Sequence, residues 1–143
     1  MITVNEVMST QVITLKASDS VSAARELMKK EDIRHIPIVN DNLVPVGLVT
    51  QRDILSAQNS NLTNGKGHPL DENSVLLEQI MSDKIAYVHP SDPLRSAGIK
   101  IQKHKYGCLP VIDNNRLVGI ITDSDFVGVA INLIEQVEQS EDF

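Results

Sequence analysis

Residues 46–53 of the chain read VGLVTQRD, and residues 118–125 read VGIITDSD. Both stretches consist of Val-Gly, two aliphatic residues, Thr, two polar residues and Asp. The aliphatic run followed by Thr predicts the end of a strand, and the polar residues after it are typical of the start of a helix. The chain therefore contains the same strand-to-helix junction twice, and this repetition decides the fold.

The duplication extends well beyond the two junctions. At an offset of 73 residues the matching positions are, in chain order, Met8-Ser9 with Met81-Ser82, Ser18-Asp19 with Ser91-Asp92, Ala24 with Ala97, and Pro37 with Pro110. The first copy then has one extra residue, so that the two junctions align at an offset of 72. An ordered series of matches of this length is typical of an internal repeat.

Each copy predicts a strand, a helix, two strands and a second helix. The first strands are Val12–Leu15 and Ile85–Val88. Helices follow, with apolar residues three or four positions apart at Val21, Ala24, Leu27 and Met28 in the first copy and at Leu94, Ala97 and Ile101 in the second. We expect Asp19 and Asp92 to cap these helices, with Pro93 at the first helical position of the second.

The remaining elements of each copy form a hairpin and a helix. The hairpins are HIPIV-NDN-LVPVGLV and CLPVI-DNN-RLVGII, whose Asn and Asp residues tolerate the left-handed backbone of a turn. The second helices begin near Gln51 and Asp123. The second of them carries an apolar stripe of Phe126, Ala130, Leu133, Ile134 and Val137.

This order predicts an α/β fold of the α+β type with two β-α-β-β-α repeats. We expect a first repeat over residues 1–58, a linker loop over 59–73, and a second repeat over 74–143 with an extended C-terminal helix. Residues 56–73 are polar and contain Gly, Pro and four Asn, which favours a loop. Residues 74–81 read as a short helical lead-in to the second repeat.

Composition restricts the class of protein. Of 143 residues, 41% are hydrophobic but only 3% are aromatic, so the core must be aliphatic. A net charge of −6 disfavours a nucleic-acid partner, which needs a basic face. The single cysteine excludes an intrachain disulfide, and we expect Cys108 to be a small, partly buried thiol in a reducing compartment. With no leader-like start and no apolar run of membrane-spanning length, we expect a cytoplasmic protein without a membrane partner.

The paired Thr and Asp of each junction have two interpretations. A Thr at a strand end and an Asp in the first helical turn satisfy free backbone groups and complement the helix dipole. The same carboxylate can also accept the two hydroxyls of a ribose, while the hydroxyl and the free N–H groups hold a phosphate. The occurrence of the pair at the same place in both copies favours the second interpretation.

The chain resembles a tandem pair of cystathionine-β-synthase (CBS) domains. The resemblance is carried by VMS, VITL, SDSVSAARELM, IRHIPIV and VGLVTQRD in the first copy, and by IMS, IAYV, SDPLRSAGIKI, YGCLPVI and VGIITDSD in the second. It covers the chain from near Val4 to near Ala130. It implies that the two repeats pack with pseudo-twofold symmetry into one module, that two clefts bind adenine nucleotides (AMP, ADP, ATP or relatives), and that the module forms a homodimer.

The resemblance also implies that each cleft combines residues of both repeats. One cleft would contain Thr14, Arg34, His35, Ile36 and Pro37 with Thr122, Ser124 and Asp125. The other would contain Tyr87, Tyr106, Gly107, Cys108, Leu109 and Pro110 with Thr50, Arg52 and Asp53. In this arrangement Asp53 and Asp125 would bind ribose hydroxyls, and Thr50 and Thr122 would contact phosphate.

The two clefts differ in charge. Arg34 and His35 supply cations to the first cleft, whereas the second obtains one from Arg52. Asp123 lies beside Thr122, and Tyr87 replaces the residue that corresponds to Thr14. We expect only one cleft to bind tightly, and we favour the cleft with Arg34, His35 and Asp125.

We therefore expect a regulatory binding module, not an enzyme, that acts on an unidentified protein. The alternative is a structural interaction or dimerisation module whose clefts are vestigial. A nucleotide-processing enzyme ranks lower, because no nucleophile and base occur in a recognisable arrangement. The four histidines lack metal-ligand spacing, so we expect no metal site and no required cofactor. The sequence leaves open whether Mg²⁺ accompanies the nucleotide.

Overall fold

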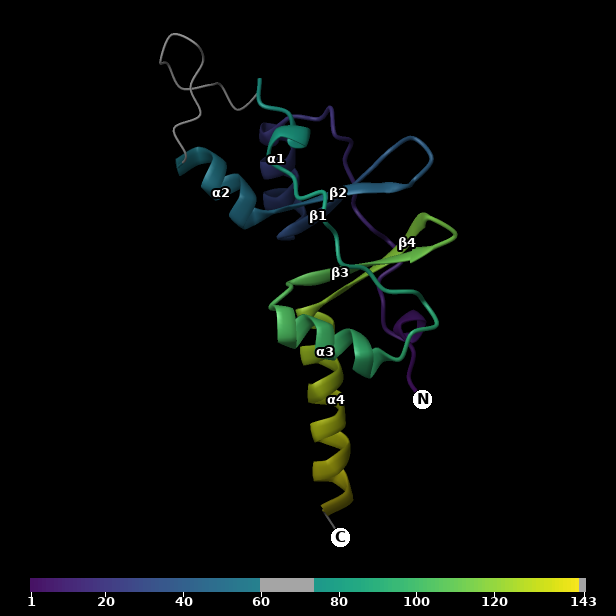
Figure 1. Cartoon of the computed structure of the whole chain (residues 1–143). Helices are drawn as coiled ribbons and strands as arrows, with labels where there is room; N and C mark the ends of the chain where they lie inside the picture. Colours follow the sequence, from purple (N-terminus) through teal and green to yellow (C-terminus); the bar gives the residue numbers. More distant parts are fainter. Residues whose placement is uncertain (60–73, 142–143) are drawn as a thin grey trace. The chain divides into compact units, whose positions relative to one another are not determined.

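The computed structural model of the chain describes residues 1–59 and 74–141 (Figure 1). Its contacts divide into two compact units. Unit 1 consists of Met1–Val12, Ala86–Asp113 and Val118–Phe143, and unit 2 consists of Ile13–Ile85 and Asn114–Leu117. The predicted α/β class with two repeats is confirmed, because each repeat contributes two α-helices and a two-stranded antiparallel sheet.

Unit 2 contains the elements of the first repeat. They are α1 (Val21–Glu31), β1 (His35–Val39), β2 (Pro45–Thr50) and α2 (Gln51–Asn59), and the unit also contains the short 3₁₀ helix η2 (Leu77–Gln79) from the second repeat. In the β1–β2 ladder His35 lies opposite Thr50, and the register shifts between Ile38 and Val39. This bulge accommodates the extra residue of the first repeat, which explains why the repeat offset falls from 73 to 72.

Unit 1 contains the elements of the second repeat. They are α3 (Leu94–His104), β3 (Cys108–Asp113), most of β4 (Arg116–Thr122) and α4 (Asp123–Glu141), and the unit also contains the 3₁₀ helix η1 (Val4–Glu6) from the first repeat. The turn between β3 and β4 places Asn114 and Asn115 at positive φ, as the sequence predicts. In the corresponding turn of the first repeat, Leu43 takes this conformation with φ 62°, which was not predicted.

The predicted first strands are present only as single-residue bridges. Leu15 pairs in parallel with Ile38, and Val88 pairs in parallel with Val111. Val88 N–H donates to the Pro110 carbonyl at 3.0 Å, and Ile112 N–H donates to the Val88 carbonyl at 2.9 Å. Each two-stranded sheet is thereby widened by a short parallel edge.

The expectation that Asp19 and Asp92 cap the first helices was wrong. Ser20 is the N-cap of α1, and its hydroxyl accepts a hydrogen bond from Ala23 N–H. The N-cap of α3 is Pro93, one position before the predicted place, with no side-chain capping bond. The two carboxylates instead accept backbone bonds from three residues upstream, Lys16 N–H to Asp19 and His89 N–H to Asp92. These bonds close the turn before each helix, and the next residues, Ser20 and Pro93, take the N-cap positions.

The lead-in segments of the two repeats are exchanged between the compact units. Val4, from the start of the first repeat, is fully buried in the core of unit 1. Val75 and Leu77, from the start of the second repeat, lie in the core of unit 2. The compact units thus differ from the predicted repeats 1–58 and 74–143 in these segments. Apart from Asn59, which ends α2, the predicted linker 59–73 lies outside the described residues.

Backbone hydrogen bonds hold each exchanged segment. In unit 1, Val4 N–H donates to the Asp92 carbonyl at 2.9 Å, and Ser9 forms a two-bond bridge with Ile120. In unit 2, Leu77 N–H donates to the Asp19 carbonyl at 2.8 Å, and Ser82 forms the same bridge with Leu48. The Met-Ser motifs begin two residues after the end of each 3₁₀ helix, and these bridges hold them along the strand that ends at the junction.

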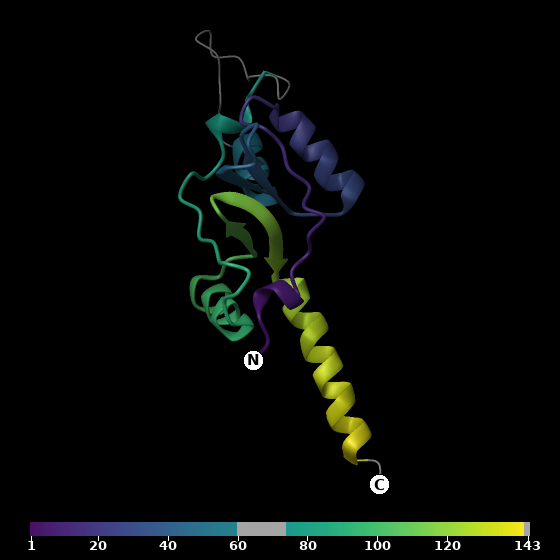
Figure 2. The ribbon, with the colours of Figure 1, turned by 90° about the vertical axis from the view of Figure 1, so that its right-hand side faces the viewer.

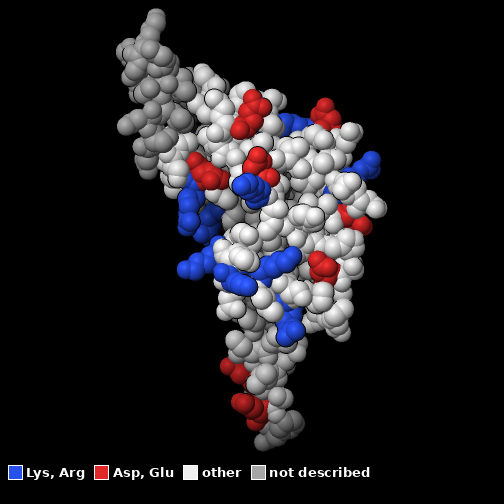
Figure 3. Space-filling model, in the orientation of Figure 1, with Lys and Arg blue, Asp and Glu red and all other residues white. Residues whose placement is uncertain are grey.

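Helix α4 extends away from the other elements of unit 1 in both Figure 1 and Figure 2. None of its residues is buried, although Phe126 and Val129 pack against the core of unit 1. Figure 3 shows acidic and uncharged atoms along the visible lower part of α4. Within residues 1–59 and 74–141, we find no helix with the length and apolar character that crossing a membrane requires.

Candidate functional site

The junction of unit 2 is a reciprocal capping box between Thr50 and Asp53. Thr50 N–H donates to Asp53 Oδ2 at 2.9 Å, and Asp53 N–H donates to Thr50 Oγ1 at 3.1 Å. Thr50 ends β2 and Asp53 lies in the first turn of α2, and both side chains are half-buried. The pair therefore satisfies two of the backbone N–H groups that a helix start leaves free.

The junction of unit 1 repeats this geometry with one difference. Thr122 N–H donates to Asp125 Oδ2 at 2.8 Å, but here the Thr122 hydroxyl also donates to Asp125 Oδ2, at 3.3 Å. The Thr50 hydroxyl accepts a bond from backbone, which leaves its own proton available, whereas the Thr122 proton is used by the carboxylate. The two junctions are thus chemically unequal in a way that the residue types alone do not show.

A backbone bond connects each junction to the segment before the hairpin. Gln51 N–H donates to the Arg34 carbonyl at 2.9 Å, and Asp123 N–H donates to the Gly107 carbonyl at 3.1 Å. The strand start, the strand end and the helix start therefore meet at one corner of each unit. Two predicted site segments of each repeat, the one before the hairpin and the Thr-x-x-Asp pair, lie together at this corner.

The predicted site residues of unit 2 differ in exposure. Arg34 and Arg52 are exposed, Thr14 and His35 are half-buried, and Ile36 and Pro37 are buried. Leu15, which follows Thr14, donates its N–H to the Pro37 carbonyl at 3.3 Å. The apolar members thus form part of the core, and only the polar members can contact a ligand.

Unit 1 shows the same separation of roles. Tyr87 and Tyr106 are exposed, Gly107 is half-buried, and Leu109 and Pro110 are buried. The Tyr106 ring stacks on His104 with 5.3 Å between centroids and 27° between planes. Lys100 Nζ donates to the Tyr87 carbonyl at 3.5 Å. Unit 1 therefore has exposed aromatic and basic side chains just before, within and just after α3, and Ser124 at its junction is also exposed.

Cys108 is a buried thiol, and it is more deeply buried than the partly buried thiol that the sequence predicts. Its side chain is 4% exposed, and burial, with a smaller contribution from the Asp123 carboxylate, raises the pKa of the Cys108 thiol to about 12. A thiol in this state is neutral near pH 7, and the thiolate is the nucleophilic form. Cys108 is therefore not a reactive centre.

The structure does not test the predicted combination of residues from different repeats. Thr14, Arg34 and His35 belong to unit 2, whereas Thr122, Ser124 and Asp125 belong to unit 1. The other predicted set divides in the same way. What each unit does bring together is the Thr-x-x-Asp pair and the pre-hairpin segment of its own repeat, and the cross-repeat clefts remain a prediction.

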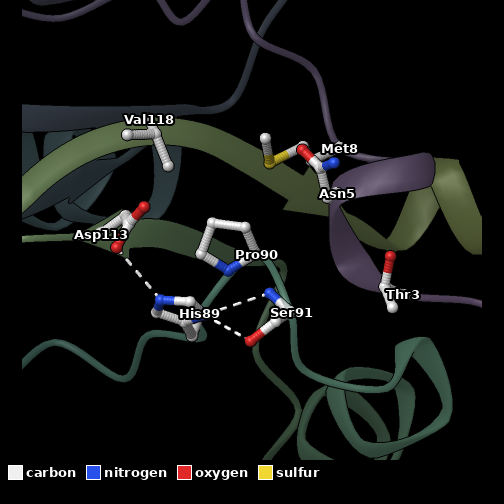
Figure 4. A pocket seen from close by; sticks show the side chains of 8 residues that line it. All are labelled: Thr3, Asn5, Met8, His89, Pro90, Ser91, Asp113 and Val118. Atoms are coloured by element: carbon white, nitrogen blue, oxygen red, sulfur yellow. Dashed lines mark hydrogen bonds and ion pairs between the residues drawn. The ribbon is translucent and has the colours of Figure 1, made fainter.

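A pocket in unit 1 was missed by the sequence analysis. It has a volume of about 470 Å³, and its lining side chains are Thr3, Asn5, Met8, His89, Pro90, Ser91, Asp113 and Val118 (Figure 4). A sequence signal did exist, because His89 occupies the position that Lys16 has in the first repeat. Exchange of the lead-in segment, which supplies Thr3, Asn5 and Met8, could not be seen from that alignment.

Comparison with protein families gives one match. The family described as "CBS domain" matches residues 4–60 and 77–132, which correspond to the two repeats. Among curated proteins, homoserine O-acetyltransferase of Methanococcoides burtonii is 32% identical over 123 residues, which are 85% of this chain and 23% of that protein. The match covers 23%, 41% and 22% of the full length of the first three curated relatives, so the chain corresponds to less than half of each of these proteins.

Solved structures resemble the chain over nearly its whole length. A putative acetoin utilization protein (AcuB) from Vibrio cholerae is 43% identical with a TM-score of 0.86, over 96% of this chain and 98% of that one. CBSX2, solved in complex with AMP, is 26% identical with a TM-score of 0.80, over 93% and 98%. The pair from MJ0100, solved with 5′-methylthioadenosine and S-adenosyl-L-methionine, is 27% identical with a TM-score of 0.79, over 92% and 98%.

Proposed function

Because the chain belongs to the CBS-domain family, we propose that it is a regulatory module that binds an adenine nucleotide of the AMP, ADP or ATP class. The observation that carries this proposal is the Thr-x-x-Asp pair at the strand-to-helix corner of both repeats. The adenosyl ligands of CBSX2 and MJ0100 support it. Binding would signal through a change of conformation, which requires different affinities for the two states.

Capping and ligand binding are compatible uses of the same carboxylates. Asp53 and Asp125 each accept their capping bonds through Oδ2. A carboxylate has two oxygens and about four lone-pair sites, so Oδ1 can still accept ribose hydroxyls. We propose that the capping bond orients the side chain before the ligand arrives, which lowers the entropy lost on binding.

We propose the two cross-repeat clefts as the binding sites. In one cleft Arg34 and His35 face the phosphate and Asp125 binds the ribose; in the other Arg52 and Asp53 take these roles. An Arg guanidinium offers paired N–H donors to phosphate, which supports both assignments in spite of the acidic net charge. We propose that the cleft with Arg34 and His35, which can supply two cations, binds the nucleotide more tightly than the other cleft.

Calorimetry with AMP tests the proposal. Asp125→Ala should weaken the tighter binding step by tenfold or more, about 1.4 kcal/mol, whereas Asp53→Ala should affect only the weaker step. Equal losses from both variants would contradict the inequality, and unchanged binding in both would contradict the site.

A matched control separates ligand contact from loss of a cap. Ser20→Ala removes the capping bond of α1, which is outside the proposed clefts. All three variants should lose about 1 kcal/mol of stability, because each removes a side-chain cap. Ser20→Ala should leave AMP affinity unchanged, so a loss of affinity in this variant would show that capping alone explains the effect.

A second function has an observation in its favour. Both carboxylates already have structural partners, which supports an interaction or dimerisation module with vestigial clefts. A thermal-shift series with AMP, ADP, ATP and S-adenosylmethionine distinguishes the two, because a ligand that binds only the folded state must raise the melting temperature. The absence of any shift would favour the second function.

We propose that the module acts without catalysis, without a required cofactor, and as a homodimer that regulates another protein in the cytoplasm. The exposed apolar residues of α4 support the homodimer, and the single, buried cysteine supports a reducing compartment. Turnover of ATP by the pure protein would contradict the non-catalytic assignment.

A further inference from the structure

We propose that the pocket of unit 1 beside His89 is a second ligand site, distinct from the nucleotide clefts, and that it binds a small organic ammonium ion with a short apolar chain. The proposal goes beyond the function proposed above, because none of the lining residues belongs to the Thr-x-x-Asp corners. It rests on the hydrogen bonds, the charge and the shape of this pocket.

His89 stands at the centre of a hydrogen-bond network in the pocket wall. Its Nδ1 lies 2.7 Å from Ser91 Oγ, and its Nε2 lies 3.1 Å from Asp113 Oδ1 (Figure 4). Ser91 N–H also donates to Nδ1, at 3.1 Å. Since a backbone N–H can only donate, Nδ1 is an acceptor, and the proton of the ring is on Nε2, where it donates to Asp113.

The imidazole is therefore neutral in this arrangement, and the charge of Asp113 is not balanced by it. No Lys or Arg is among the side chains that line the pocket in the described part of the chain. The Thr3 hydroxyl and the Asn5 amide can both donate and accept, and the other groups left for a ligand are acceptors, namely the second oxygen of Asp113 and the lone pairs of Ser91 Oγ. Such a wall favours a cationic donor and disfavours an anion such as phosphate.

The first repeat shows the same chemistry completed within the chain. Lys16, which aligns with His89, forms an ion pair with Asp41 in the turn after β1. The hydrogen bond and charge of Lys16 lower the pKa of the Asp41 carboxyl. In the second repeat Asn114 occupies the position of Asp41, the nearest carboxylate is that of Asp113 at the end of β3, and the shorter imidazole has replaced the lysine ammonium. A ligand ammonium in the pocket would restore the missing cation.

Apolar side chains give the pocket its selectivity for the rest of the ligand. Met8, Pro90 and Val118 line it together with Thr3 and Asn5 from the lead-in segment. A volume of about 470 Å³ is within the range of small-molecule sites. The ammonium would bind Asp113, and a short alkyl chain would lie against Met8 and Val118.

The test is a titration of the full chain with butylammonium, followed by NMR of the histidine rings and of the Met8 methyl group. We expect saturable shifts at His89 and Met8. Butyrate has the same chain length and the opposite charge, and it should cause no saturable shift. Absence of a saturable shift with butylammonium, or equal shifts with butyrate, would overturn the proposal.

Two variants keep the fold and change the site. Asp113→Asn removes the charge but retains an oxygen that accepts from Nε2, and it should weaken butylammonium binding by about tenfold or more. His89→Lys supplies an internal cation, as in the first repeat, and should block binding. Asp41→Asn, the matched change in unit 2, should leave it unchanged. Retained affinity in Asp113→Asn, or equal loss in Asp41→Asn, would overturn the assignment. All three variants should leave AMP binding unaffected, so the proposal for this pocket and the proposal for the nucleotide clefts can be contradicted separately.

Discussion

Gly47 and Gly119 are the residues that let the lead-in segments approach the strands. A Cβ atom on Gly47 would lie 2.5 Å from Met81 Sδ and 3.1 Å from the Ser82 carbonyl. On Gly119 it would lie 2.6 Å from Met8 Sδ and 2.9 Å from the Ser9 carbonyl. The Val-Gly of each junction motif is thus explained by contact with the Met-Ser of the other repeat. The glycine allows this close packing, whereas the Thr-x-x-Asp pair caps the helix at the strand-to-helix corner.

Gly47→Ala and Gly119→Ala should each destabilise the protein by about 1 to 3 kcal/mol, the usual effect of overpacking a core, as measured by urea denaturation. Met81→Ala should partly rescue Gly47→Ala, because the flexible methionine makes the closest contact. Met8→Ala should rescue Gly119→Ala less well, because the backbone carbonyl of Ser9 also obstructs the new methyl group.

Gly128 provides the matched control. It lies in the exposed helix α4 and has no atom within 4 Å of an added Cβ. Gly128→Ala should raise stability by up to about 1 kcal/mol through helix propensity. Destabilisation of the same size at Gly128 would show that the close approach at the other two positions is not the cause.

Cys108 gives a prediction of pH dependence. Because burial raises the pKa of the folded thiol to about 12 from an ordinary value of 9.0, the unfolded chain loses this proton first as the pH rises. The stabilisation from the neutral thiol is complete below pH 9.0 and is lost between there and about pH 12. Cys108→Ala should flatten the fall in the free energy of unfolding over this interval. A fall of equal steepness in the variant would contradict the burial of the thiol.

At the scale of elements, the sequence predicts the order and the two junctions well. Helices α2 and α4 begin at Gln51 and Asp123, as expected, because a strand that ends in Thr with Asp three residues later is a strong local signal. The caps at Asp19 and Asp92 were predicted wrongly, because an Asp before a helix can also bond to an upstream N–H. Local sequence patterns identify the residues that could cap a helix, and the geometry of the turn before the helix determines which of them does.

Helix α4 carries the prediction on assembly. Val127, Ile131, Ile134 and Val137 are each at least half exposed, although they share one side of the helix. We expect light scattering to give the mass of a dimer for the unmodified chain. Replacing both Ile131 and Ile134 with Glu should yield a monomer of unchanged helix content.

The control for this experiment is on the same helix. Asn132 lies on the opposite side of α4, about 100° beyond Ile131 in the direction away from Ile134. Asn132→Glu adds a negative charge to α4 without entering the apolar stripe, so the dimer should persist. Dissociation by Asn132→Glu alone would indicate general charge repulsion and would count against the apolar interface.

At the scale of the whole molecule, each compact unit depends on a segment from the other repeat. Val4 is buried in unit 1, and Leu77 is buried in unit 2. This exchange could not be predicted, because repeat matching gives the order of segments and not the core that receives them. The pocket beside His89 was missed for the same reason.

Hydrogen exchange tests the reciprocal dependence. Val4→Ala should destabilise by about 1 to 3 kcal/mol and speed exchange most at Leu109 and Val111 of unit 1. Leu77→Ala should cost about 2 to 5 kcal/mol and act first at Ile36 and Ile38 of unit 2. If Val4→Ala acted first on unit 2 and Leu77→Ala on unit 1, the exchange of lead-in segments between the repeats would be contradicted. If hydrogen exchange sped up equally in both units, the two units would open together.

The pairing of Ser9 with Ile120 has a consequence for how the protein is made. Residues 1–12 leave the ribosome about a hundred residues before Arg116–Thr122, the strand that receives them. Val4 and Met8 must therefore remain without their native partners until β4 has been synthesised. Contacts of such sequence separation slow folding. Closure of this segment onto β4 is the step at which the nascent chain first acquires a complete unit 1.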